Sequence, residues 1–274
     1  MNAIPLGIYL VAAICYTVHF ARRDPGVGRA ATTILVAGAF ANTFVIGMQT
    51  MEVWNAAFAS ASRAASTFAW LLTLAYLYTE LTTDERAMGV FILPIVVVLQ
   101  VVSTLTPATV VPNPLLDSPW FWVHMLSLLF AYASFALAGV LGLTYVLQFK
   151  EIKKKNLGFF YTRLPSLQIL DVMNARTVTV GWVLLTVGVV VGVIWAQQAH
   201  AATPGDPAVQ AFSIGDPKIL ITVLTWLMYS FALVARRALG WSGRKAAWLS
   251  AAGFVVIMLS FLPINYFLTT SHSF

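Results

Sequence analysis

Long apolar stretches alternate with short polar segments along the whole chain. Eight of the stretches are long enough to cross the ~30 Å hydrocarbon layer of a bilayer as an α-helix, which takes roughly 20 residues. They cover residues 2–20, 30–48, 64–81, 87–105, 120–149, 177–199, 219–235 and 246–270. The pattern predicts an all-α protein, a polytopic transmembrane helical bundle with about eight spans.

The amino-acid composition favours a membrane protein over a helical bundle in water. Hydrophobic residues make up 59% of the 274 positions and charged residues 9%, against roughly 25% charged residues in soluble domains. A soluble bundle needs more charge than this on its outward faces. The single cysteine, Cys15, excludes a disulfide framework, a thiolate zinc site and an internal CxxC redox pair.

The basic residues predict how the spans are oriented. With the N-terminus outside, all but two of the 16 Lys and Arg residues fall on the inner side, and the exceptions are Arg63 and Lys218. Because positively charged loops stay in the cytoplasm, the topology is predicted to be N-out and C-out. The net charge of +6 follows from this topology and from contact with lipid headgroups, so it does not indicate a nucleic-acid partner.

Two segments near the predicted inner surface need separate interpretation. The first span lacks a basic leader and a small-residue cleavage site, so we expect a retained helix rather than a signal peptide. The longest polar segment, residues 150–176, contains a Lys-rich run and then LPSLQILD at residues 164–171. That amphipathic pattern predicts a helix lying along the membrane surface, either as a phospholipid anchor or as a docking surface for a cytoplasmic partner.

Short catalytic motifs are missing from the chain. It contains no GxxxxGK phosphate loop, no HExxH and no GxSxG. Carboxylates are nearly absent from the predicted spans, which argues against a proton relay of the pump type. A hydrolase is therefore not indicated, and an ion-coupled transporter is only weakly supported.

Three of the four histidines fall on the outer side in this topology. His124 begins the fifth span among the aromatic residues of PWFWVHM, His200 follows the sixth span and His272 follows the eighth. Histidines of two spans near one membrane surface can supply trans axial nitrogens to a planar metallocofactor. Alternatively they belong to the interfacial aromatic belt with Trp120 and Trp122. Spacing alone leaves both interpretations open.

Further tryptophans fit the second of these interpretations equally well. Trp195, Trp226 and Trp248 lie within or near predicted spans, where tryptophan usually anchors a helix at the interface or packs between helices. Their positions alone do not identify a cofactor platform.

Several motifs of the second half follow one another in a fixed order. Residues 124–147 contain H-x-x-x-x-x-x-A-Y-x-x-F-x-x-A, and residues 164–196 contain L-P-x-L-x-x-L-D-x-x-x-x-R and a glycine-studded helix that ends in W-A. These are followed by three more motifs: GDPKILITVLTWLMY, GWSGRKAAWLSAAGF and a terminal N-x-x-x-x-x-x-H-S-F. In order and spacing these motifs resemble the cytochrome c assembly family of heme-handling membrane proteins, which includes CcsA, ResC, CcmC and HemX-like proteins.

The resemblance divides the chain into two regions. Residues 111–274 are similar to the heme-handling membrane domain of the family. Residues 1–110 form an N-terminal four-helix membrane region that matches only weakly, through NAAFAS at residues 55–60 and FAWLL at residues 68–72, which are similar to HemX-like and CcsA proteins.

The resemblance also implies a cofactor and its ligands. His124 and His272 occupy the positions of the two external histidines that flank the outer loop of the family and coordinate heme. The implied cofactor is a non-covalent b-type heme with these two histidines as axial ligands of the iron. The remaining candidate cofactor-binding residues are Trp120, Trp122, Asp216 and Trp226.

Two parts of the family pattern are missing here. The outer loop of the family resembles W-G-x-x-W-x-W-D-P-K-E, with tryptophans that form a platform for heme, whereas this chain keeps only GDPK at residues 215–218. A membrane-embedded histidine of CcsA-type members is replaced by Val234, and a glutamate is replaced by Ala59. We therefore expect a heme-binding protein that does not by itself attach heme to an apocytochrome.

Three functional hypotheses remain. The first is an integral membrane protein of the bacterial inner membrane that handles or presents heme at the outer leaflet, together with other membrane subunits or cytochrome c assembly partners. The second is a b-heme redox subunit that passes electrons between quinone and an external cytochrome. The third is a heme-free, HemX-like scaffold or regulatory subunit of a membrane complex. The family resemblance favours the first.

Overall fold

The computed structural model describes residues 2–52, 60–106, 118–155, 158–202 and 217–267 of the chain. Within these ranges every regular element is an α-helix, as predicted. The helices are α1 (Ala3–Arg22), α2 (Pro25–Glu52), α3 (Ala61–Thr83), α4 (Gly89–Leu105), α5 (Pro119–Lys153), α6 (Phe159–Arg163), α7 (Leu167–Ala202), α9 (Pro217–Ala238) and α10 (Arg244–Phe267). Each of the eight predicted spans overlaps one of these helices, and α6 is a short addition.

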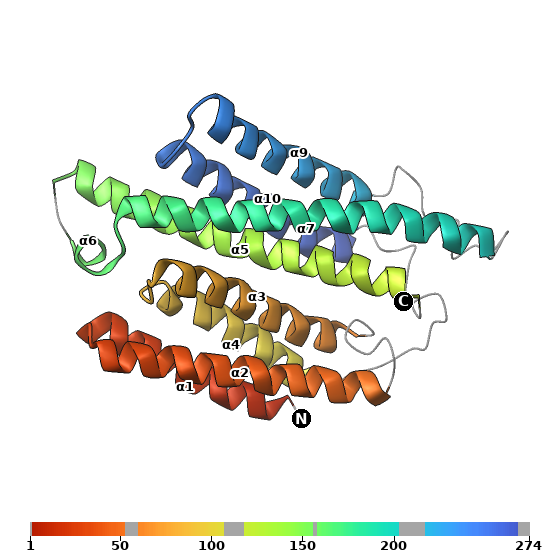
Figure 1. Ribbon diagram of the computed structural model, residues 1–274, viewed down its shortest axis with the longest axis horizontal. Helices are drawn as coiled ribbons and strands as arrows, with labels where there is room; N and C mark the ends of the chain where they lie inside the picture. The colour runs from red at the N-terminus through yellow and green to blue at the C-terminus, as the bar shows by residue number, and fades with distance from the viewer. Residues whose placement is uncertain (1, 53–59, 107–117, 156–157, 203–216, 268–274) are drawn as a thin grey trace.

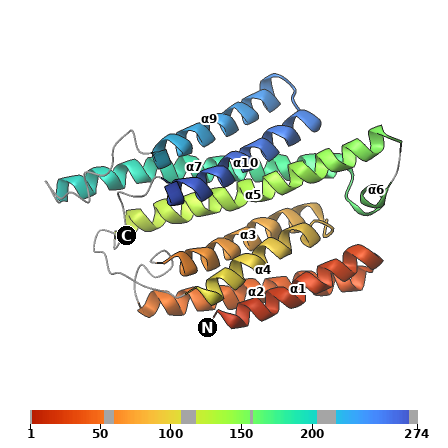
Figure 2. The ribbon, with the colours of Figure 1, turned by 180° about the vertical axis from the view of Figure 1, so that it is seen from behind.

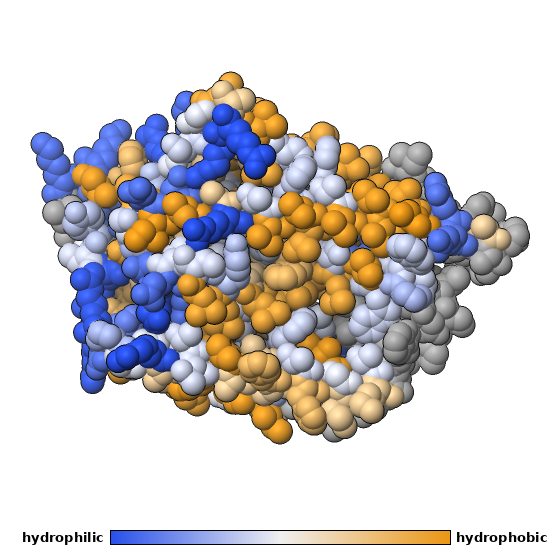
Figure 3. Space-filling view, in the orientation of Figure 1, coloured by the Kyte–Doolittle hydropathy of each residue, from blue (hydrophilic) through white to orange (hydrophobic). Residues whose placement is uncertain are grey.

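The helices form a multi-pass membrane bundle. Five of them are long and apolar enough to cross a membrane: Ala3–Arg22, Pro25–Met51, Pro119–Lys153, Leu167–Gln198 and Ile219–Ala238. Large apolar side chains point outward, as Phe40 and Phe44 do with exposed fractions of 71% and 68%. Figure 3 shows apolar surface over the middle of the bundle and hydrophilic residues gathered at its left end. This surface suits lipid as the solvent, whereas the exact number of spans stays a prediction.

Consecutive helices run up and down the bundle, as Figure 1 and Figure 2 show from opposite sides. One end of the bundle, on the left in Figure 1, therefore contains the last turns of α1, α3, α5 and α9. It also contains the first turns of α2, α4, α7 and α10. We call this end the basic end, because these turns carry Arg22, Arg23, Arg86, Lys150, Lys153, Arg176, Arg236, Arg237, Arg244 and Lys245.

The turn between α1 and α2 explains why α2 begins earlier than predicted. Arg23 adopts a left-handed conformation (φ 56°) and ends α1. The Asp24 carboxylate then accepts hydrogen bonds from the backbone N–H groups of Gly26 and Val27, at 2.7 and 3.3 Å. Such a cap satisfies the free donors of a first turn, and Pro25 suits the first helical position. The predicted span begins at residue 30, because the prediction used only the apolar pattern and not these polar residues.

The start of α7 differs from the prediction. The LPSLQILD segment does not form a separate helix on the membrane surface, because its last five residues are the first turns of α7. Leu170 is fully buried in the core of the bundle. Asp171 forms an ion pair with Arg236 and accepts a hydrogen bond from the backbone N–H of Gly243 at 3.0 Å. The apolar face of the segment thus packs on neighbouring helices, and Asp171 holds the α9–α10 turn.

Two buried apolar clusters hold the helices together. The larger one joins α1 to α5 with the first turns of α7 and α10, and it includes Tyr16, Leu72 and Leu137. The smaller one joins α5, α7, α9 and α10 around Phe135 and Tyr229, whose rings stack with centroids 3.7 Å apart. Residues on both sides of position 110 share the larger cluster, so the two regions inferred from the sequence pack on one core. The boundary itself stays a prediction.

A buried carboxylate connects the first four helices near the basic end. Glu80 on α3 is only 1% exposed. It accepts hydrogen bonds from the hydroxyls of Tyr16 on α1 and Thr32 on α2, at 2.6 and 2.5 Å. The Nε atom of Arg86, which lies just before α4, is 3.8 Å from its Oε1 atom. The charge of Glu80 is thus compensated by two hydroxyl donors and one guanidinium.

Candidate functional site

His124 lies on the second turn of α5, at the end of the bundle opposite the basic end. Its Nδ1 atom is 2.7 Å from the carbonyl oxygen of Gly188 on α7. Because a carbonyl oxygen only accepts hydrogen bonds, Nδ1 carries the proton and donates it. In a neutral imidazole the other nitrogen, Nε2, then holds a lone pair. The contact fixes the ring so that Nε2 is available as a ligand.

The imidazole fits against α7 because residue 192 is glycine. A Cβ atom at Gly192 would lie 2.4 Å from Nδ1 and 2.5 Å from Cε1 of His124. A Cβ atom at Gly188 would likewise lie 2.8 Å from Cδ2 of Leu128 on α5. The two glycines form a G-x-x-x-G pattern on one face of α7, an arrangement that lets two membrane helices approach closely. This close approach brings the Gly188 carbonyl within reach of His124.

Aromatic rings surround the half-buried imidazole. The ring of His124 stacks on Trp195 of α7, with centroids 6.2 Å apart and an interplanar angle of 23°. Phe121, one turn earlier on α5 and 7% exposed, lies 5.2 Å from the same indole. The site therefore offers one oriented imidazole in apolar surroundings. Among the described residues no group of three or more His, Cys, Asp or Glu side chains could hold a metal ion.

The structure places the predicted site residues in different locations. His272 and Asp216 lie outside the described residues, and His200 lies in the last turns of α7. Trp120 is 42% exposed at the start of α5, one position before the buried Phe121. Trp122, which follows Phe121, is partly buried. Of the predicted residues whose side chains the structure describes, His124 is the one histidine, and it has a fixed ring and an apolar aromatic neighbour.

Trp226 belongs to the contact between α7 and α9. Its indole Nε1 donates a hydrogen bond to Thr186 Oγ1 at 2.9 Å, and its ring stacks on Trp182 with centroids 6.2 Å apart. The Nε1 atom of Trp182 in turn donates to Ser230 Oγ at 2.7 Å. These bonds give Trp226 a packing role between two helices, and its assignment to a cofactor stays a prediction.

Sequence reasoning missed three residues that build the surroundings of His124. Gly188, Gly192 and Trp195 follow one another at i, i+4 and i+7 along α7, so they share one helix face. The sequence GVVVGVIW contains this signal in full. The sequence alone predicts only an anchoring or packing role for Trp195, because it does not show which helix packs on this face.

Comparison with known proteins identifies relatives over most of the chain. Residues 59–272 match a family model described as Cytochrome C assembly protein. The Cytochrome c biogenesis protein CcsA of Guillardia theta is 28% identical over 227 residues, which cover 75% of this chain and 72% of that protein. The protein of the same name from Pyropia yezoensis is 24% identical over 311 residues, covering 98% and 94% of the two chains.

A third relative extends the similarity to nearly the whole chain. The Cytochrome c biogenesis protein CcsA of Prochlorococcus marinus (strain MIT 9303) is 24% identical over 312 residues, which cover 99% of this chain and 92% of that protein. The family model spans the helices from α3 to α10, so it includes His124 on α5 and its partners on α7. The chain belongs to the cytochrome c assembly protein family.

Proposed function

We propose that this protein binds heme at the end of the bundle that carries His124 and presents it for cytochrome c assembly. The observation that carries the proposal is the hydrogen bond from His124 Nδ1 to the Gly188 carbonyl. Histidines that bind metals commonly donate their second ring N–H to a backbone carbonyl, which fixes the tautomer and the ring orientation. The relatives are named cytochrome c biogenesis proteins, which supports the same role.

The donor set fits heme iron. Imidazole is a common axial ligand of heme, and a porphyrin needs an apolar environment on both sides of its ring. His124 would supply one axial nitrogen and His272 the other, with Trp120, Trp122, Asp216 and Trp226 as further candidates for contact with the cofactor. Bound in this way, the b-type heme would provide a redox-active iron held by two neutral imidazoles.

The other residues of the site act through His124. The Gly188 carbonyl holds the proton on Nδ1, so Nε2 stays available without a tautomer change. Gly192 leaves space for the ring. Trp195 covers one face of the imidazole with apolar surface, and Phe121 packs against the Trp195 indole. Together they prepare one ligand position before any cofactor arrives.

An absorption spectrum of the full chain tests the proposal. The protein is purified in detergent from heme-replete membranes and measured before and after addition of dithionite. We expect a sharp reduced α-band at a b-type position with the features of two imidazole ligands. A featureless spectrum would contradict the proposal and would favour the heme-free scaffold.

The orientation of the bundle gives a second prediction. We infer that the basic end faces the cytoplasm of a bacterial cell and that the His124 end faces outward, since basic loops are retained inside. A C-terminal fusion to alkaline phosphatase, which needs an oxidising compartment for its disulfides, should be active. A fusion after Lys155 should be inactive. The reverse pattern would place His124 in the cytoplasm and rule out presentation of heme at the outer leaflet.

The third prediction concerns covalent attachment of heme. Because only GDPK at residues 215–218 remains of the tryptophan-rich loop, we expect this chain alone not to attach heme to a CxxCH apocytochrome. The measurement is coexpression with a reporter apocytochrome in a strain without its own maturation genes, followed by heme staining. A strain with a complete maturation system is the positive control. Covalent c-type heme without added synthase components would show that the loop is not required.

A further inference from the structure

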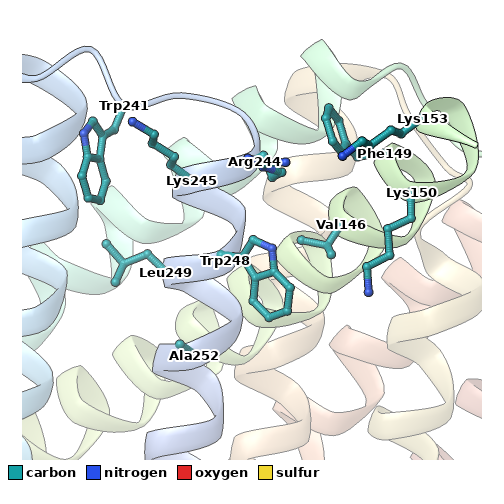
Figure 4. A pocket seen from close by; sticks show the side chains of 10 residues that line it. All are labelled: Val146, Phe149, Lys150, Lys153, Trp241, Arg244, Lys245, Trp248, Leu249 and Ala252. Atoms are coloured by element: carbon teal, nitrogen blue, oxygen red, sulfur yellow. The ribbon is translucent and has the colours of Figure 1, made fainter.

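A pocket of about 660 Å³ lies between α5 and α10 at the basic end of the bundle. Figure 4 shows that its side chains come from the last turns of α5 and from the first turns of α10 with the turn before it. Four of the lining residues are basic: Lys150, Lys153, Arg244 and Lys245. The remaining ones are aromatic or aliphatic, so the pocket combines a strong positive charge with apolar walls.

Among the described residues, none of the four cations forms an ion pair with a carboxylate. In the part of the chain that the structure describes, ion pairs are made by Arg86 and Arg236, not by the pocket residues. Three cations lie over aromatic rings instead. Arg244 is 5.3 Å from the ring centre of Phe149, Lys245 is 5.1 Å from Trp241, and Lys150 is 6.0 Å from Trp248. Contact with a ring face positions a cation while leaving its N–H donors available.

The first turn of α10, which carries Arg244 and Lys245, also favours an anion in the pocket. Both residues lie in the first turn of the helix, which contains no acidic residue. The positive end of the helix dipole lies there, so basic side chains are unfavourable at these positions. The same turn has backbone N–H groups without helical acceptors, which favours anions. An anion bound between the side chains would compensate for both effects.

The apolar part of the pocket continues away from the cations. Trp248, Leu249 and Ala252 follow Arg244 along α10, toward the middle of the bundle, and Val146 faces them from α5. Trp248 is 53% exposed. A ligand that fills this space carries its negative charge at the basic end and its apolar portion along the helices. An anionic phospholipid has this arrangement of groups in a membrane.

We propose that this pocket is a specific binding site for one anionic phospholipid. The phosphate is held by Lys150, Lys153, Arg244 and Lys245, and the acyl chains lie along Trp248 and the aliphatic residues beside it. The site does not depend on heme binding, because it lies at the other end of α5 from His124. It differs from general attraction of a basic surface to lipid, because it requires particular cations and a particular tryptophan.

Native mass spectrometry of the full chain in detergent tests the proposal. Phosphatidylglycerol is the probe, and phosphatidylcholine, which carries no net charge, is the comparison lipid. We expect one tightly bound phosphatidylglycerol and no corresponding phosphatidylcholine. Replacing Arg244→Gln together with Lys245→Gln should weaken binding about thirtyfold, since each basic residue near an anionic lipid contributes about fivefold.

A matched variant distinguishes the pocket from general charge attraction. Lys154 and Lys155 are exposed, follow α5 directly and do not line the pocket. Lys154→Gln together with Lys155→Gln removes the same charge from the same end, and we expect a loss of less than about twofold because the pocket cations remain. Equal losses in the two double variants, or equal binding of the two lipids, would overturn the proposal.

Two further measurements complete the test. Trp248→Ala keeps all four cations and should weaken phosphatidylglycerol binding about fivefold through loss of the ring contact, so an unchanged affinity would contradict the site even if the Arg244 and Lys245 variant does not fold. Glycerol 3-phosphate carries the phosphate without acyl chains. We expect it not to displace the lipid at equal concentration, whereas full displacement would identify a site for free phosphate and overturn the lipid proposal.

Discussion

Replacing His124 with alanine is expected to abolish the bis-histidine heme spectrum of the purified protein. The substitution removes Nε2, the proposed ligand atom, which the Gly188 hydrogen bond keeps unprotonated. His272→Ala should have the same effect, because His272 is the proposed second axial ligand. Heme content and reduced band positions of the variants are compared with those of the unchanged protein. Added free imidazole should restore part of the spectrum by occupying the vacant axial position.

Two other histidines serve as controls for this experiment. His19 lies near the basic end, where its Nδ1 atom is 2.8 Å from the carbonyl oxygen of Asp24. It therefore resembles His124 in its hydrogen bond but lies at the wrong end of the bundle. His200 is followed by a proline-containing sequence at residues 203–216, so we expect it to be a poorly oriented ligand. His19→Ala and His200→Ala should both retain heme. If His124→Ala and His272→Ala also retain the original heme content and band positions, the proposed site is wrong.

A glycine substitution tests whether heme binding depends on the orientation of the His124 imidazole and not only on its presence. Gly192→Ala introduces a Cβ atom that would lie 2.4 Å from His124 Nδ1, so the ring has to move away from the Gly188 carbonyl. We expect lower heme occupancy although both ligands remain. Gly47→Ala on α2 is the control, because no other atom lies within 4 Å of a Cβ atom at that position. Equal heme occupancy in the two variants would mean that the orientation of His124 by α7 is unimportant.

Removal of the buried Glu80 carboxylate is expected to destabilise the bundle strongly. Glu80→Ala leaves the Tyr16 hydroxyl without its acceptor, removes one of the two acceptors of the Thr32 hydroxyl, and leaves Arg86 without its buried partner. Breaking a buried ion pair by removing one partner typically costs about 3 kcal/mol or more. The free energy of unfolding, measured by titration with a denaturing detergent, should fall by about this amount. Glu80→Gln should lose less, because its amide oxygen still accepts one hydroxyl proton.

Asp84 provides a matched control for Glu80. Its carboxylate pairs with the same arginine, Arg86, at 3.0 Å, but its side chain is 85% exposed. Exposed ion pairs contribute less than about 1 kcal/mol, and asparagine tolerates the left-handed conformation of this residue. Asp84→Asn should therefore change the free energy of unfolding only slightly. Equal effects at Glu80 and Asp84 would show that burial of the carboxylate does not matter.

The sequence predicted the helices of this fold well, because a membrane helix needs a long apolar stretch and little else. It predicted their boundaries less well, since polar caps such as Asp24 extend α2 beyond the apolar stretch. It was wrong about residues 167–171, because an amphipathic pattern does not show whether its apolar face meets lipid or another helix. Leu170 meets other helices.

The candidate site could be predicted only in part for a related reason. His124 stood out because a histidine at the start of an apolar span is unusual, but its acceptor at Gly188 lies 64 residues away in the chain. Glu80 is likewise bonded to residues 48 and 64 positions away. Such contacts depend on which helices become neighbours. A single sequence contains the matching faces but does not state their pairing.

The uninterrupted length of α5 links membrane thickness to the depth of the His124 imidazole in the membrane. From His124 to Lys150 the helix rises by about 39 Å at 1.5 Å per residue, close to the ~40 Å thickness of a bilayer that includes its headgroup regions. A helix cannot stretch, so α5 accommodates a thinner bilayer by tilting, whereas a thicker bilayer has to thin locally around it. Because Gly188 and Gly192 bind α7 tightly to α5, both helices tilt together. The lipid thickness of the host membrane therefore sets how far His124 stands from the aqueous phase.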